Sequence, residues 1–125
     1  MNGWRWMMVI VGLGLLTMAG CGSLTPRNFR AMSNPAPVVR AGAVSLGDNE
    51  PDSVAIPAWI GRLDDKDPVV RMAANESLKK RTGQDFGFVA WAEPGPRTAA
   101  VTKWKAWWAA KAKTQGGLVS RGRKR

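Results

Sequence analysis

The chain has 125 residues and a formal net charge of +10, from 19 Lys and Arg against 9 Asp and Glu, with one cysteine and no histidine. A single cysteine excludes an intrachain disulfide framework and a structural zinc site built from this chain alone. The absence of histidine removes the commonest general base. Residues 21–96 carry nine basic and nine acidic residues, whereas from Arg97 onward there are nine basic residues and no acidic one. The positive excess therefore belongs to the C-terminal part of the chain.

Residues 1–20 have the pattern of an export signal. Arg5 precedes the apolar run MMVIVGLGLLTM at 7–18, and the small residues Ala19 and Gly20 stand directly before Cys21. A charged start, about a dozen apolar residues and small residues at the cut are typical of cleaved signals. The run is short for a transmembrane helix, which needs about 20 apolar residues. The alternative is a short buried helix that ends at a free cysteine.

The segment Met18-Ala19-Gly20-Cys21 resembles the end of the signal in bacterial lipoprotein precursors. The resemblance implies cleavage after Gly20 and attachment of lipid to Cys21, because a thiolate is the nucleophile that accepts the diacylglyceryl group. Two or more acyl chains hold a protein on a membrane where one chain is marginal. The mature protein is then expected in the cell envelope, anchored to a membrane by lipid on Cys21 and facing the periplasm or the exterior.

Residues 21–51 are predicted to form a flexible tether. The segment contains four prolines, several Gly and Ser, and no sustained helical or strand periodicity. Such a composition buries too little apolar surface to offset chain entropy, and about 30 flexible residues would place a domain roughly 30 Å from its anchor on average. Within the segment, Ala41–Leu46 is interpreted as either a short strand or a docking segment.

Residues 52–113 are predicted to form the folded domain, which is all-α. A first helix begins at Asp52 or Ser53 and runs to about Leu63, because one apolar stripe recurs at helical spacing: Ile56, Trp59, Ile60 and Leu63. Asp67 is expected to cap a second helix with Pro68 at its first position, and Gly83 to end it.

These two helices together resemble a HEAT repeat, over residues 56–82. The matching residues are Ile56-Pro57-Ala58, Leu63, Asp65, Asp67-Pro68, Val70-Arg71, Ala73-Ala74 and Leu78. In HEAT arrays the turn aspartate and the helix arginine hydrogen-bond along the stack, so the resemblance implies structural roles for Asp65 and Arg71. A single repeat cannot bury its own apolar face. A third helix is therefore expected to complete the core.

That third helix is predicted from Arg97 to about Lys113. It carries an aromatic stripe at helical spacing: Ala100, Val101, Trp104, Trp107 and Trp108. The stripe is read as core, with a partner-binding face formed by Trp104, Trp107, Trp108, Lys103 and Lys105 as the alternative. Residues 114–125 are predicted to be a basic, disordered tail.

The sequence does not favour an enzyme. Asp64, Asp65 and Asp67 are interpreted as turn and cap residues, because calcium loops need more ligands at fixed offsets. We therefore expect no catalytic residue, no cofactor and no metal site. The leading hypothesis is a membrane-tethered interaction module with an envelope protein of unknown identity as its partner. The alternative is charge-driven association of the basic C-terminal helix and tail with anionic lipid or cell-wall polymer. No nucleic acid partner is expected for an exported protein.

Overall fold

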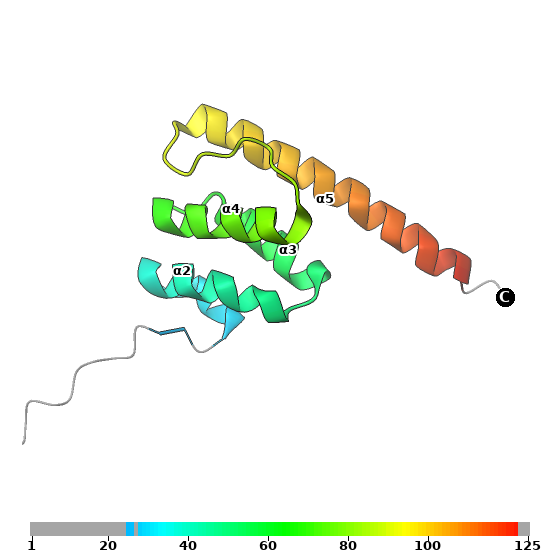
Figure 1. The fold of residues 1–125 in the computed structure, drawn as a ribbon, viewed down its shortest axis with the longest axis horizontal. Coiled ribbons are helices and arrows are strands. Elements are labelled where there is room, and N and C mark those ends of the chain that lie inside the picture. Colours follow the sequence, from blue (N-terminus) through cyan, green and yellow to red (C-terminus); the bar gives the residue numbers. More distant parts are fainter. Residues whose placement is uncertain (1–24, 27, 123–125) are drawn as a thin grey trace, which may run out of the picture.

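The computed structural model describes residues 25–26 and 28–122, with side chains described as far as Gln115. The secondary structure of this part is entirely helical, which confirms the predicted all-α class. Figure 1 shows the order of the stack: α2 (Pro37–Ser45) lies beside α4 (Pro68–Thr82), α4 packs on α3 (Asp52–Arg62), and α5 (Pro94–Gly122) packs on α3. Two short 3-10 helices, η1 (Phe29–Ser33) and η2 (Leu46–Asn49), flank α2.

The hairpin of α3 and α4 forms where the sequence predicted it. The Asp67 side chain accepts a hydrogen bond from the backbone N–H of Val69 at 2.8 Å, and Pro68 opens α4 with the fixed φ that a first helical turn requires. Gly83 ends α4 in the left-handed conformation with φ 68°, where a side chain would be strained. These local signals are sufficient to place both ends of α4.

The prediction of a flexible tether is wrong for residues 29–49. This segment folds as η1, α2 and η2, and it contributes buried apolar side chains to the core: Phe29, Met32, Val39, Ala43 and Val44. Pro37 is the first residue of α2, and Pro51 stands directly before α3. These prolines lie at element boundaries and therefore do not interrupt a helix. Ala41–Leu46 is helical up to Ser45 and is therefore not a strand.

Trp59 occupies the centre of the core. Its side chain is fully buried, and its indole Nε1–H donates a hydrogen bond to the backbone carbonyl of Val44 at 2.9 Å, which ties α3 to the end of α2. The ring of Phe29 meets it edge to face, with centroids 6.4 Å apart. Both rings lie against Gly47, where a Cβ would stand 2.6 Å from a ring carbon of each. A glycine at position 47 is what allows this close approach.

Helix α5 covers the other side of the hairpin and then extends past it. Ala100, Val101 and Trp104 are buried in the core, while the C-terminal half of α5 projects away from the remaining helices in Figure 1. The helix reaches Gly122, so the prediction of disorder from residue 114 is wrong for 114–122. Ala and Lys, which are good helix formers, fill much of the stretch from Ala99 to Lys113, and no proline follows Pro96 to end the helix.

We expect Gly47→Ala to destabilise the protein by about 1–3 kcal/mol, because the added methyl group overpacks the contact with Trp59 and Phe29. The matched control is Gly61→Ala in α3. A Cβ at position 61 meets no atom within 4 Å, so this change should stabilise α3 by roughly 0.5–1 kcal/mol. Urea unfolding followed by circular dichroism measures both. Equal effects of the two substitutions would show that the Gly47 contact is not tight.

Candidate functional site: a buried charge network and a basic helix

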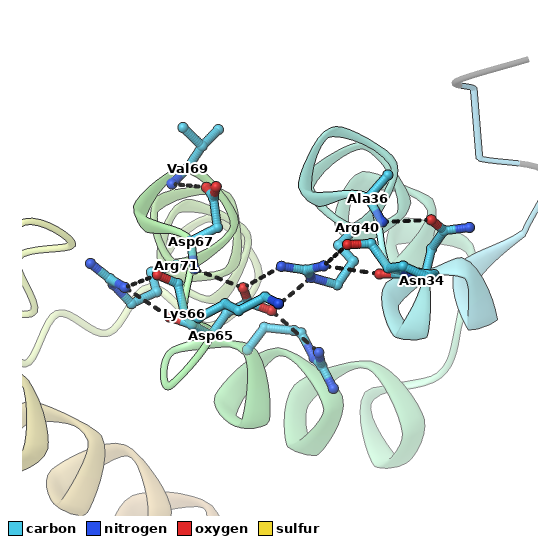
Figure 2. Close-up of polar contacts among 10 residues, drawn as sticks. Asn34, Ala36, Arg40, Asp65, Lys66, Asp67, Val69 and Arg71 are labelled. Carbon is cyan, nitrogen blue, oxygen red and sulfur yellow. Dashed lines mark hydrogen bonds and ion pairs between the residues drawn. The ribbon is translucent and has the colours of Figure 1, made fainter.

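Asp65 lies in the turn between α3 and α4, and its carboxylate is the centre of a buried charge network. Arg40 of α2 binds it with two parallel hydrogen bonds, from Nε to Oδ2 at 2.9 Å and from Nη2 to Oδ1 at 2.8 Å. Both side chains are almost completely buried, at 6% and 4% exposure. The backbone N–H of Asp67 donates to Oδ1 at 3.0 Å, and Arg62 reaches Oδ2 at 3.3 Å. Figure 2 shows these groups converging on the one carboxylate.

The surroundings of Asp65 keep its carboxylate charged. Burial by itself raises the pKa of Asp65, but the hydrogen bond from Arg40, the backbone N–H of Asp67 and the positive charges of Arg40 and Arg62 outweigh burial. The pKa of Asp65 therefore lies below its ordinary value. The hydrogen bond to Asp65 in turn holds the pKa of Arg40 above its ordinary value. Both groups stay ionised over the whole physiological pH range.

Arg71 of α4 binds backbone carbonyl groups on two sides. Its Nη1 donates to the carbonyls of Asp65 and Lys66 at 2.8 and 3.1 Å, which ties α4 to the preceding turn. Its Nε and Nη2 donate to the carbonyl of Ala90 at 2.8 and 2.6 Å, which holds the loop before α5. Arg71 thus contacts the backbone of the predicted turn, whereas the carboxylate of Asp65 pairs with Arg40.

Arg40 and Arg71 occupy equivalent positions of a repeated unit. Arg40 also donates from Nη1 to the carbonyls six and five residues before it, those of Asn34 and Pro35, at 2.9 and 2.8 Å. Arg71 makes the same two bonds at the same offsets. The side chains of Asn34 and Asp65 each accept the backbone N–H two residues on, at 2.9 and 3.0 Å. Each position of the second unit lies 31 residues after its counterpart in the first, as 71 does after 40.

The sequence reasoning missed this repeat, although a signal for it exists. The tetrapeptide Pro-Val-Val-Arg occurs at 37–40 and again at 68–71. Buried apolar residues match at the same offset, since Phe29 corresponds to Ile60 and Met32 to Leu63. The repeated tetrapeptide therefore identifies the first unit, whereas the proline content of residues 21–51 by itself favours a tether.

The aromatic residues of α5 divide into one core ring and two boundary rings. Trp104 is fully buried and meets Phe86 edge to face, with ring centroids 4.7 Å apart. It is therefore core, and this corrects the alternative that placed Trp104 on a partner-binding face. Trp107 and Trp108 are partly buried at the edge of the same cluster. The ammonium group of Lys111 lies 5.1 Å from the centroid of the Trp107 ring, within the range of a cation–π contact.

The other predicted site residues fall in two places. Lys103 and Lys105 are exposed on α5, and Lys105 makes only a long ion pair of 3.6 Å with exposed Asp64. Gly20 and Cys21 lie outside the described residues. In the described part of the chain, no three metal-ligating side chains cluster as a metal site. None of the helices described there has a stretch long and apolar enough to cross a bilayer.

We expect Asp65→Asn to cost about 3–5 kcal/mol at neutral pH, because Arg40 would remain buried without its counter-charge. The folded-state pKa of Asp65 is depressed, so its charge stabilises the fold above the unfolded pKa of about 3.9, and this contribution is lost as pH falls below that value. The difference in the free energy of unfolding between wild type and Asp65→Asn should therefore become smaller in acid. The control is Asp64→Asn, an exposed neighbour expected to change stability by less than about 0.5 kcal/mol. Urea unfolding at a series of acidic pH values measures this difference. A difference that does not change with pH would contradict the stabilising role of the Asp65 charge.

The tryptophans allow a second matched comparison. Trp104→Ala should cost about 3–5 kcal/mol, because it removes a fully buried ring from the core. Trp91, which is 61% exposed, should cost far less when it is replaced by Ala. Thermal melts of the two variants measure the difference. Equal melting temperatures would mean that α5 does not form part of the core.

Comparisons with protein-family models, with curated proteins and with solved structures found no match to this chain. What the protein does is therefore inferred from its own residues. Three features are available for that inference: the cysteine at position 21, the exposed apolar side chains, and the basic helix α5.

Proposed function

We propose that this protein is a non-catalytic interaction module of the cell envelope, built from HEAT-like helical units and held on a membrane by lipid on Cys21. The observation that carries the proposal is the contrast between its buried charges and its exposed apolar side chains. The buried charges bind each other or backbone carbonyls of the fold. Two of the exposed apolar side chains, Val38 and Val69, lie at equivalent positions of the repeated unit.

The buried charged side chains are bound to other groups of the fold. Arg40 and Asp65 bind each other, and Arg71 binds three backbone carbonyls. A catalytic acid, base or electrophile needs an accessible polar atom aimed at a site where substrate can lie. The polar atoms of these three residues are directed at the protein itself, which supports a structural role for this network.

Apolar side chains are exposed at equivalent positions of the two units. Val38 of α2 is 57% exposed and Val69 of α4 is 49% exposed, and with Pro37 and Asp67 they line a shallow groove. Val89 and Trp91 add further exposed apolar surface on the loop that Arg71 holds. Exposed apolar patches rimmed by polar groups are typical of protein interaction sites. This surface supports the proposal of a protein partner in the envelope.

The proposed anchor would keep this surface close to the membrane. Seven residues lie between Cys21 and Phe29, the first residue of η1. Such a segment spans at most about 30 Å when fully extended and about 15 Å on average when flexible. The body of the protein would then stay beside the lipid headgroups, nearer than the predicted tether of 30 residues would have placed it.

The test of the anchor is the intact mass of the protein extracted from membranes. We expect the wild type to lack residues 1–20 and to carry the added mass of a diacylglyceryl group, with or without a further acyl chain. Cys21→Ser should retain Met1 and carry no lipid. Ser23→Ala, which leaves the cysteine and the residues before it intact, should be processed like the wild type. An unmodified wild-type chain that begins at Met1 would refute the anchor.

A further inference from the structure

The C-terminal half of α5 has no helix packed against it in the described part of the chain. From Ala109 to Gln115 every side chain is exposed except Lys111, which lies over Trp107. Figure 1 shows this half of the helix extending beyond the body, past the end of the stack. An isolated helix of this length is marginal in water. A partner that binds it would stabilise its helical state.

Most of the charge of α5 is not neutralised by the body, since among the described residues only Lys105 of this helix forms an ion pair, at 3.6 Å with Asp64. From Arg97 to the end of the chain there is no acidic residue. Ion pairs within the rest of the protein engage most of the acidic residues of the body: Asp48, Asp52, Asp65, Glu76 and Asp85. Within the described residues, Lys103 and Lys113 form no ion pair. The helix therefore presents positive charge to an external partner.

The lysines of α5 point in different directions around the helix axis. With about 100° of rotation per residue, Lys111 and Lys113 lie roughly 80° to either side of Lys103, and Lys105 lies nearly opposite Lys103. A flat lipid surface meets one side of a helix and selects for an amphipathic arrangement with cations on a single face. Cations on more than one face instead suit a flexible anionic chain, which can follow them along the exposed surface of the helix.

We infer that α5 binds a flexible phosphodiester polymer of the cell envelope. Each ammonium group is a compact charge on a flexible stem, which can follow phosphates whose positions vary along a mobile chain. Trp107 and Trp108 stand at the base of the free half, where their exposed edges contact the apolar parts of the polymer backbone. The assignment to an envelope polymer, and not to nucleic acid, rests on the proposed export of the protein. The charge arrangement itself does not depend on export.

The experiment uses the full chain in neutral detergent and a fluorescently labelled poly(glycerol phosphate) as the probe, with fluorescence anisotropy measured at several salt concentrations. The test variant is Lys103→Gln with Lys113→Gln. The control is Lys66→Gln with Lys80→Gln, which removes the same charge from exposed lysines of the body. We expect the test variant to bind roughly 10- to 100-fold more weakly and to lose about two from the slope of log affinity against log salt. The control should bind within about threefold of wild type.

Equal losses from the two double variants would overturn the inference, because they would show that only total charge matters. Two further probes test the kind of partner at equal phosphate concentration: vesicles of phosphatidylglycerol and phosphatidylcholine, and single-stranded DNA. A larger loss of vesicle or DNA binding than of polymer binding, when Lys103 and Lys113 are replaced, would overturn it as well. Because wild type and variant share the same Cys21, this difference is independent of whether Cys21 carries lipid.

Discussion

Arg40 and Asp65 form a buried, bidentate ion pair between residues 25 positions apart, and the rest of the fold is arranged around it. A buried pair adds little net stability compared with apolar residues of the same volume, because both charges lose their hydration. Loss of one partner is costly, however, since the other charge stays buried. The pair therefore acts as a positional constraint. It sets α2 against the turn that opens α4, and other arrangements that kept one of the two charges buried would leave it unpaired.

Contacts made by the two buried arginines help so small a protein to cover both sides of its apolar core. The hairpin of α3 and α4 offers a thin apolar surface, and a segment of that size is marginal by itself. Residues 29–49 cover one side of it with Phe29, Met32 and Val44, and α5 covers the other side with Val101 and Trp104. Arg40 secures the first contact and Arg71 the second, through the carbonyl of Ala90. Arg40 thus joins the first unit to the second, and Arg71 joins the second unit to the loop before α5.

The stack also separates the two parts of the chain that are proposed to meet partners. The first folded residues, close in sequence to Cys21, belong to the end of the stack at η1 and α2, while the basic helix α5 lies on the other side of the hairpin in Figure 1. Positive charge held away from the lipid anchor would be free to engage a polymer above the membrane surface. An anchored module of this form would connect a membrane to the anionic material around it.

Features that depend on neighbouring residues could be predicted from the sequence alone. Asp67, Pro68 and Gly83 placed the ends of α4, the period of Ile56, Trp59 and Ile60 identified α3, and the composition after Arg97 located the charge. Only the tertiary structure decided which groups meet across the chain. It paired Asp65 with Arg40, buried Trp104 while leaving Trp91 exposed, and folded residues 29–49, whose prolines look the same in a tether as at helix boundaries. Capping and periodicity act within one or two helical turns, whereas burial depends on packing between distant segments.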